Sequence, residues 1–348
     1  MILSSCAANE AAASGDTGAT APTSLSGTLN GVGSSAQGSA EIAWGTDFQK
    51  ANPKVTVNYD PQGSGAGRTN FLSGAATFAG SDAALKDTEI ATASPNCAPG
   101  TKPIDLPVYI SPIAIAYNVD GLKNLKLDAV TIAGIFKGTI TKWDDKAITS
   151  QNSGATLPSA PITVVHRSDD SGTTQNFTEY LSANAPTVWD KPSAQTFPYA
   201  VGDAAKGTSG VADAVKSAKN SITYIDESGA AGLGIAQLKV GSDYVTINAA
   251  GAADVVAKSP VASGREAGDL AIAIDRKITD ANSWPMVLVS YLIVCQNYAD
   301  AGKAELVKAY ARYIASDAGQ QSAAKNAGSA PLSKELAAKV TKVIETIK

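Results

Sequence analysis

Three short loops rich in glycine and serine carry most of the groups that could do chemistry in this chain. They cover residues 31–37, 62–68 and 166–174, and each stands between a strand-like run and a helical pattern. Glycine lets the backbone approach a ligand closely, and a helix N-terminus carries a partial positive charge. One such loop alone is more often an ordinary helix cap. Three of them in one chain predict an anion-binding site.

These loops do not match the signatures of nucleotide-binding proteins. The chain lacks the Gly-Lys-Ser/Thr ending of a Walker loop, and the G-x-G-x-x-G pattern that starts at Gly31 fails because Ala36 stands at its last position. A small anion therefore fits better than a nucleotide.

The composition narrows the chemistry further. The chain has 28 lysines and arginines against 32 acidic residues, a net charge of −4, so it has no overall positive field to collect nucleic acid. A single histidine, His166, and three cysteines argue against a zinc cage and against histidine-based catalysis. We expect no metal, no cofactor and no nucleic-acid partner. The site must be built from hydroxyls, carboxylates, arginines and backbone amides.

Alternating strand-like and helical patterns must position the loops. Apolar and β-branched runs predict strands, and Ala-rich stretches that open with Ser, Thr, Gly or Asp predict helices. The predicted strands are 55–59, 104–110, 162–165, 221–225 and 287–294, and the predicted helices are 40–51, 69–74, 129–136, 173–183, 210–219 and 301–316. This alternation indicates an α/β fold.

The length of 348 residues suggests two domains. Because no Gly/Ser/Pro linker follows residue 26, two lobes would have to be joined by ordered strands. The extended segments 107–117 and 284–293 are the candidates for these crossovers.

The first residues resemble the lipobox of bacterial lipoproteins. Leu3 and two serines precede Cys6, and residues 7–26 are almost wholly small and polar, a composition typical of a flexible tether. We therefore expect residues 1–25 to be a lipobox and tether, with a lipid on Cys6. The basic and apolar regions of a signal peptide are missing, so the written start looks truncated or misassigned. The alternative is an accidental cysteine.

The other two cysteines form an even pair, Cys97 and Cys295. Paired cysteines in exported proteins are usually bridged, so we predict a disulfide between them, with free buried thiols as the alternative. No run of about 18 apolar residues occurs in the sequence.

Four segments together resemble the phosphate-binding protein of the bacterial Pst-type ABC importer. They are FAGSDA at 78–83, IFKGTITKWDD at 135–145, RSDDSGT at 167–173 and SWPM at 283–286, in the same order as in that family. The resemblance implies a type II periplasmic-binding-protein fold, with two α/β lobes, two crossover strands and a ligand in the cleft. We place one lobe at 26–110 plus 285–348 and the other at 111–284.

The resemblance also implies a role and partners. The chain would be an extracytoplasmic lipoprotein that captures inorganic phosphate and delivers it to the membrane permease of an importer. It would be a monomer, held to the outer face of the cell membrane only through Cys6. A phosphate sensor or surface protein of the same fold, without a transport role, is an alternative.

The ligand contacts of the family fall on matching positions of this chain. They predict phosphate binding by Ser34, Ser35, Ala36, Ser64, Ala66, Asp82, Arg167, Asp169, Ser171, Gly172 and Thr173. Asp169 would hold the Arg167 guanidinium, and Ser171 to Thr173 would donate from a helix start. The family commonly has a serine where this chain has Ala66, so Ser64 or a backbone N–H would substitute.

Asp82 is the informative residue of this set. A carboxylate beside an anion is repulsive unless the ligand brings a hydrogen, which phosphate has at neutral pH and sulfate lacks. A site built to accept that hydrogen can reject the analogue without it by a factor on the order of 10⁴. The alternatives are that Asp82 only caps a helix and that Arg167 only forms a surface ion pair.

A phosphoester hydrolase is the rival from another class. Ser171 lies near His166 and Asp169 in sequence, but neighbours in one loop do not generally reach triad geometry, and no G-x-S-x-G elbow is present. The S-x-x-K match at 322–325 lacks its K-T-G partner. We expect His166 to be a packing or hydrogen-bonding residue at a strand end, and the protein not to be an enzyme.

Overall fold

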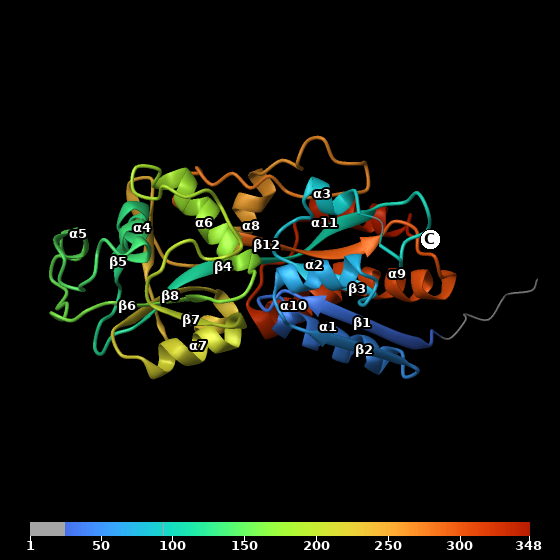
Figure 1. The fold of residues 1–348 in the computed structure, drawn as a ribbon, viewed down its shortest axis with the longest axis horizontal. Helices are drawn as coiled ribbons and strands as arrows, with labels where there is room; N and C mark the ends of the chain where they lie inside the picture. The colour runs from blue at the N-terminus through green and yellow to red at the C-terminus, as the bar shows by residue number, and fades with distance from the viewer. Residues whose placement is uncertain (1–24, 93) are drawn as a thin grey trace, which may run out of the picture.

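The computed structural model describes residues 25–92 and 94–348 of the chain. The molecule is elongated and has two lobes (Figure 1), with β1–β3 and the C-terminal helices in the first lobe and β5–β8 in the second. Cys6 lies outside the described residues, so its predicted lipidation stays a prediction. None of the helices in the described part of the chain is long and apolar enough to cross a membrane.

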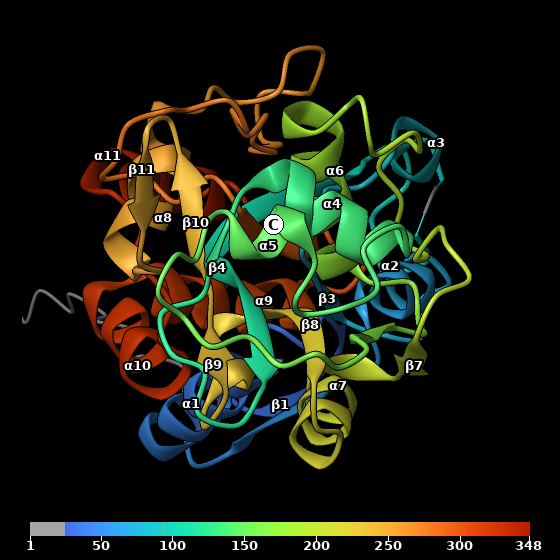
Figure 2. The same cartoon turned by 90° about the vertical axis from the view of Figure 1, so that its left-hand side faces the viewer.

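A nine-stranded sheet runs through both lobes. Along it the order is β2-β1-β3-β12-β4-β8-β6-β7, and β9 pairs with β4. Its strands are β1 (Gly27–Gly33), β2 (Val55–Asp60), β3 (Phe78–Ser81), β4 (Pro103–Asn118), β6 (Thr163–Arg167), β7 (Asp203–Ala205), β8 (Ser221–Asp226), β9 (Gly234–Ile235) and β12 (Val287–Cys295). A second sheet joins β5 (Lys126–Leu127), β10 (Gln237–Val240) and β11 (Asp243–Val245) in the order β11-β10-β5. Figure 2 shows β10 and β11 side by side in the second lobe, which faces the viewer, and the two strands pair antiparallel.

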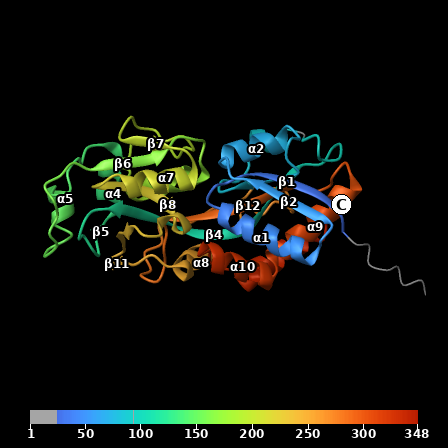
Figure 3. The same ribbon diagram turned by 90° about the horizontal axis from the view of Figure 1, so that it is seen from below.

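Strand β4 belongs to both lobes. Its residues 103–112 pair antiparallel with β12, and its residues 113–118 pair antiparallel with β8. The chain returns from the second lobe at Met286, whose carbonyl accepts a hydrogen bond from the Ile113 amide at 2.7 Å. Both crossovers therefore lie side by side, as Figure 3 shows for β4 and β12 between the lobes. The lobe limits predicted at 110/111 and 284/285 stay predictions; they fall inside β4 and just before β12.

Helices cover the sheet in both lobes. Those of the first lobe are α1 (Gly38–Ala51), α2 (Ser64–Leu72), α3 (Asp87–Ile90), α9 (Ala301–Ala315), α10 (Asp317–Ala327) and α11 (Lys334–Ile344). Those of the second are α4 (Ala129–Lys137), α5 (Lys146–Thr149), α6 (Gly172–Asn184), α7 (Gly207–Ser217), α8 (Ala249–Lys258) and the 3₁₀ turn η1 (Glu227–Ala230). Local signals set their ends, as in α4, where Asp128 accepts a hydrogen bond from the Thr131 amide and Gly138 ends the helix in a left-handed conformation.

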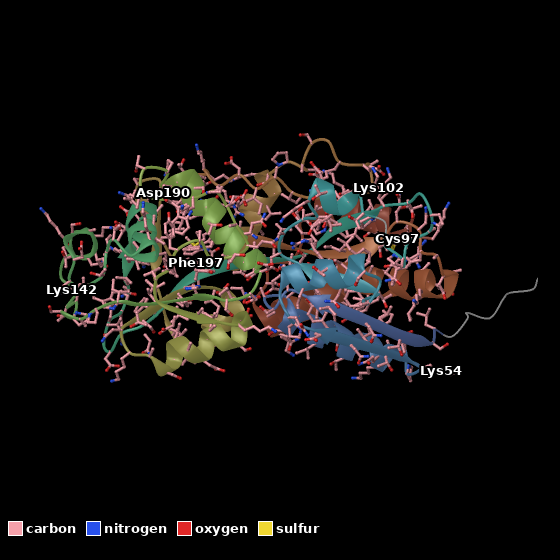
Figure 4. The ribbon with its side chains drawn as sticks, viewed as in Figure 1. Lys54, Cys97, Lys102, Lys142, Asp190 and Phe197 are labelled. Carbon is pink, nitrogen blue, oxygen red and sulfur yellow. A yellow bond between two sulfur atoms is a disulfide. The ribbon has the colours of Figure 1, made fainter. Side chains whose placement is uncertain are left out.

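The first lobe contains a disulfide. Cys97 and Cys295 form a disulfide with Cα atoms 5.2 Å apart. Cys295 ends β12, and Figure 4 shows Cys97 in the first lobe, far from Phe197 in the second. The disulfide therefore ties the end of a crossover strand to the loop before β4 and lies away from the junction of the lobes.

Each predicted strand and helix overlaps an element of the structure. Several boundaries differ from the prediction. Strand β4 runs to Asn118 and not to 110, and helix α2 begins at Ser64 and not at 69, so most of the second loop is the first turn of a helix. No range was predicted for α8, α10, α11 or the β10–β11 hairpin. Helix α10 contains alanines, glutamines and a glycine rather than an apolar stripe, which explains why its pattern was weak.

Candidate functional site

Four helix N-termini from the two lobes meet at the junction. Helices α1 and α2 come from the first lobe, and α6 and α7 come from the second. A Cβ atom at Gly172, the first residue of α6, would lie 2.7 Å from both Asp82 Cβ and Ser64 Oγ, so only glycine permits this approach. A Cβ at Gly207, the first residue of α7, would lie 3.7 Å from that of Ser35. The three predicted loops therefore converge, together with a fourth before α7.

Asp82 lies where the two lobes touch. It follows β3 directly, and the residue is only 3% exposed. Its Oδ1 accepts a hydrogen bond from Ser34 Oγ in the first lobe, and its Oδ2 accepts one from Thr173 Oγ1 in the second at 3.1 Å. The Asp82 amide donates to Ser64 Oγ at 3.1 Å, and its carbonyl accepts from Asn176 Nδ2 at 2.7 Å. Burial raises the pKa of Asp82, although these hydroxyls and Arg167 act in the opposite direction.

Arg167 ends β6 and is a buried cation at the junction of the lobes. Its residue is 4% exposed, and the guanidinium donates from Nε and Nη2 to Asp169 Oδ1 and Oδ2 at 2.7 and 2.5 Å. The Gly207 amide also donates to Asp169 Oδ1 at 3.0 Å. Burial acts to raise the pKa of Asp169, but the hydrogen bonds and charge of Arg167 outweigh it and lower that pKa. Asp169 thus orients Arg167. Of the three guanidinium nitrogens, only Nη1 makes no hydrogen bond to Asp169.

The first loop presents hydroxyls and amides at the start of α1. Ser34 Oγ accepts hydrogen bonds from the amides of Ala36 and Gln37 at 3.1 and 3.2 Å while it donates to Asp82. Ser35 reaches across to the second lobe, where the Thr208 amide donates to Ser35 Oγ at 3.0 Å. This loop therefore touches the opposite lobe at Thr208.

Most of the predicted contact residues come together. Ser34, Ser64, Gly172 and Thr173 each contact Asp82, Ser35 lies against Gly207, and Arg167 is held by Asp169. Ser171 is the N-cap of α6, and its Oγ accepts a hydrogen bond from the Thr174 amide at 3.1 Å. Ala66 differs, because it lies inside α2 and its carbonyl accepts from Asn70 Nδ2. Of the two second-loop residues, Ser64 is the one that contacts Asp82.

Sequence reasoning missed several residues of the junction. The fourth loop, with Gly207 and Thr208, follows the same Gly/Ser/Thr pattern as the other three and could have been found that way. Asn176 and Gln195 could not, because their partners are distant in sequence: Asn176 holds the Asp82 carbonyl, and Gln195 Oε1 accepts from Arg68 Nη2 at 2.7 Å.

The local geometry argues against a serine hydrolase in this loop. His166 Nδ1 lies 2.9 Å from the Arg167 carbonyl, and the ring stacks on Phe197 with centroids 4.2 Å apart. These contacts agree with the predicted packing role. Ser322 of the S-x-x-K match donates to Asp47 Oδ2 at 2.6 Å on an exposed part of α10. Neither serine is placed against a histidine base.

The formal charges of the junction do not by themselves favour an anion. Arg167 contributes +1, while Asp169 and Asp82 each contribute −1 when ionised. Any affinity for an anion must therefore come largely from amides, hydroxyls and the positive ends of helices. The converging helix starts supply such groups from both lobes.

Comparison with known proteins defines the class first. Residues 18–318 match the model of the PBP superfamily domain, so the chain belongs to that superfamily, and its fold is the type II periplasmic-binding-protein fold. Within the superfamily, the chain belongs to the family of PstS phosphate-binding proteins, because close relatives carry that name. Phosphate-binding protein PstS 3 of Mycobacterium leprae (strain TN) is 40% identical over 289 residues, which cover 81% of this chain and 77% of that protein. Phosphate-binding protein PstS 2 of Mycobacterium tuberculosis (strain ATCC 25618 / H37Rv) is 35% identical over an alignment of 359 residues, covering 100% and 95%.

Solved structures share the fold. A high affinity periplasmic phosphate-binding protein, PfluDING, bound with phosphate at pH 8.5, superposes with a TM-score of 0.75 at 24% identity and covers 91% of this chain and 93% of that chain. A human phosphate binding apolipoprotein superposes with a TM-score of 0.69 at 25% identity and covers 90% and 93%. The two-lobed architecture is therefore shared well beyond the sequence relatives.

Proposed function

We propose that this chain binds inorganic phosphate between its two lobes and presents it to an ABC importer. The observation that carries the proposal is the position of Asp82, a buried carboxylate among helix N-termini and within the field of Arg167. A carboxylate in such a place is costly unless the anion beside it shares a hydrogen. The relatives named for phosphate binding support this assignment.

Phosphate would be held by contacts from both lobes. Arg167 would donate from Nη1, the nitrogen that Asp169 leaves available. The amides and hydroxyls that start α1, α2 and α6 would supply the other hydrogen bonds, from Ser35, Ala36, Ser64, Ser171, Gly172 and the Thr173 amide. The Thr173 hydroxyl already donates to Asp82. Short, charge-assisted bonds of this kind can replace the hydration of a dehydrated anion. Ser34 would act on Asp82, to which it already donates.

Asp82 would select for phosphate against sulfate. Its carboxylate can accept the hydrogen of HPO₄²⁻ or H₂PO₄⁻, whereas sulfate at neutral pH would leave two unbridged like charges. A buried acceptor without its partner costs the full desolvation of that group. We therefore expect discrimination on the order of 10⁴.

Binding and lobe closure would be one event. The junction is already bridged by contacts such as Asp82 to Thr173 and the Gly65 amide to the Asp170 carbonyl at 3.0 Å. A ligand that bonds to both sides adds to these bridges and stabilises the closed form. The closed form would then be the one that the importer recognises.

The protein would act outside the cytoplasm, as a binding protein and not as an enzyme. Cys6 would carry the lipid that anchors it to the outer face of the cell membrane, and the chain would work as a monomer. Mass spectrometry of the mature N-terminus tests this part: a diacylglyceryl-modified cysteine is expected at position 6, and an unmodified thiol would contradict it.

Isothermal titration tests the main proposal. The protein is unfolded, freed of co-purified ligand, refolded, and titrated with phosphate and with sulfate at pH 7. Tight binding of phosphate with sulfate weaker by orders of magnitude is expected. Comparable affinity for both anions would refute the role of Asp82, and no binding of phosphate would refute the function.

Turnover of a phosphomonoester that disappears in Ser171→Ala would instead favour a hydrolase.

A further inference from the structure

A second buried carboxylate, Asp226, stands behind the phosphate site. It ends β8, the residue is 0% exposed, and no ion pair to it occurs in residues 25–92 and 94–348. Its Oδ2 accepts from Ser228 Oγ at 2.7 Å and from Tyr109 OH at 3.4 Å, and its Oδ1 accepts from Thr208 Oγ1 at 3.4 Å. None of the segments that resemble the Pst family contains this residue.

Few charges face this carboxyl. Burial is the largest influence and raises the pKa of Asp226 to about 7; Ser228 lowers it, the charge of Asp82 raises it, and Arg167 lowers it. The other titratable neighbours are Tyr109, whose own pKa is raised well above its usual value, and Glu227, the next residue in the chain. Asp226 therefore changes its charge near neutral pH.

Thr208 connects this carboxyl to the first loop. Ser35 Oγ lies 3.1 Å from Thr208 Oγ1 and accepts from the Thr208 amide at 3.0 Å. Each hydroxyl has a single hydrogen to donate. The hydrogen bonds that join Ser35, Thr208 and Asp226 must therefore all run in one direction, either toward Asp226 or away from it. The order depends on whether Asp226 is ionised.

The two charge states give opposite hydrogen-bond directions. When Asp226 is ionised, the Thr208 hydroxyl donates to it, and the Ser35 hydroxyl donates to Thr208 Oγ1. When Asp226 is neutral, its own hydrogen goes to Thr208 Oγ1, and the Thr208 hydroxyl donates to Ser35 Oγ. Only in the second case is the Ser35 hydrogen available to a ligand in the cleft.

We propose that Asp226 is a positioning residue of the anion site, which acts through Thr208 to direct the Ser35 hydroxyl toward the bound phosphate or away from it. The proposal rests on the proposed function, because it needs Ser35 to donate to phosphate. It gives the buried Asp226 a role beyond capping η1, where its side chain accepts from the Ser228 amide at 3.3 Å.

The relay predicts the sign of a pH effect. At a pH below the pKa of Asp226 the carboxyl is neutral and Ser35 donates to phosphate. As the pH rises through that value the donor is turned away and the affinity falls. By linkage, binding of phosphate must favour uptake of a proton at Asp226.

Comparison with Asp226→Asn isolates this effect from the ionisation of phosphate itself. The amide is always neutral, its oxygen can still accept from Ser228, and its NH₂ can donate to Thr208 Oγ1 as the neutral acid does. We expect the ratio of the wild-type Kd to the variant Kd to be near 1 at pH 5.5 and to rise about tenfold by pH 8.5, the worth of one hydrogen bond.

Thr208→Val keeps the backbone donor to Ser35 but removes the hydroxyl that connects Ser35 to Asp226. The ratio of its Kd to that of Thr208→Val/Asp226→Asn is expected to stay near 1 at every pH. If that ratio still rises tenfold, Asp226 acts through space and the relay is wrong. Circular dichroism and the melting temperature of each variant show that it is folded.

A second measurement needs no stable variant. Calorimetric titration of the wild type in buffers of different ionisation enthalpy gives the protons taken up on binding, and at pH 7.5 the uptake should exceed that calculated from phosphate alone. A flat wild-type to Asp226→Asn ratio, or uptake explained by phosphate alone, would leave Asp226 as a cap and overturn the relay. Both results leave phosphate binding intact. Absence of phosphate binding at all pH values would overturn the proposed function together with the relay.

Discussion

The two lobes offer different halves of an anion site. The first lobe contributes the starts of α1 and α2 and a carboxylate, Asp82. Its described loop residues offer no unpaired cation to the cleft, because Arg68 Nε lies 3.0 Å from Glu89 Oε1. The second contributes Arg167, fixed by Asp169, together with the starts of α6 and α7. Neither half balances the charge of phosphate alone. Affinity for the anion is therefore a property of the closed molecule.

Loss of Arg167 should have the largest effect on this balance. Arg167→Ala removes the buried cation and leaves Asp169 and Asp82 without it, so phosphate affinity should fall roughly 100-fold, the worth of a charge-assisted hydrogen bond of about 3 kcal/mol. Arg167→Lys keeps the charge but not the bidentate contact with Asp169. Its phosphate affinity should lie between that of the wild type and that of Arg167→Ala. Arg312→Ala, an exposed arginine paired with Glu345, is the control and should bind as the wild type does. Titration calorimetry measures all three; an unchanged affinity in Arg167→Ala would contradict the division of roles between the lobes.

Asp82 should control sulfate binding in a pH-dependent way. Because burial raises its pKa, Asp82 becomes neutral at a higher pH than an ordinary aspartate, and the neutral carboxyl can donate a hydrogen to sulfate. Wild-type sulfate affinity should therefore rise as the pH falls from 7 to 5.

The matched variants are Asp82→Asn and Asp170→Asn. The amide at 82 can donate at any pH, so sulfate should bind that variant more tightly at pH 7 and with little pH dependence. Asp170 is an exposed neighbour in the third loop, and its variant should keep the wild-type profile. Competition of sulfate against labelled phosphate measures the effect, and a wild-type sulfate affinity that does not change with pH would count against it.

A smaller effect is expected at the bridge between Arg68 and Gln195. Gln195→Ala removes the acceptor of Arg68 Nη2 across the junction without touching the proposed ligand contacts. The closed form should lose about 1 kcal/mol, and phosphate should bind about fivefold more weakly, with faster release. Gln62→Ala, an exposed glutamine bonded to Asp60 within the first lobe, should bind normally. Stopped-flow release of phosphate separates them; identical release rates would show that the bridge does not stabilise closure.

The disulfide should not affect the anion site at all. Replacement of Cys97 and Cys295 by serine opens a link between residues 198 apart in sequence, and the free energy of unfolding should fall by roughly 2–5 kcal/mol. The phosphate Kd should stay within a factor of two, since the bridge lies in the body of the first lobe. Chemical denaturation and calorimetry measure the two quantities. A large loss of affinity in a variant that is still folded would mean that the two regions are not independent.

Much of this architecture could be predicted from local sequence patterns. The first and third Gly/Ser loops stand before helices as expected, because the signals for a turn and a helix start lie within a few residues of each other. The resemblance then ordered them around one ligand. Ser64 was harder to place, because Gly65 and Gly67 follow it and glycine disfavours a helix interior, so the local pattern indicates a later start.

The remaining parts depend on contacts between segments far apart in the chain. Asp226 looks like an ordinary strand end, and only the fold brings it next to Thr208 and within the field of Asp82. Asn176 and Gln195 lie in a helix and a loop with no distinctive pattern, and they matter because closure brings them against the first lobe. Contacts between segments that are distant in the chain leave no pattern in the local sequence.

A crystal structure of the phosphate complex tests the central claim most directly. The anion should lie between the lobes, with one oxygen within hydrogen-bond distance of Arg167 Nη1 and another close enough to Asp82 to share a hydrogen with it. Phosphate bound on the surface of one lobe, with Arg167 and Asp82 touching only protein, would contradict the account.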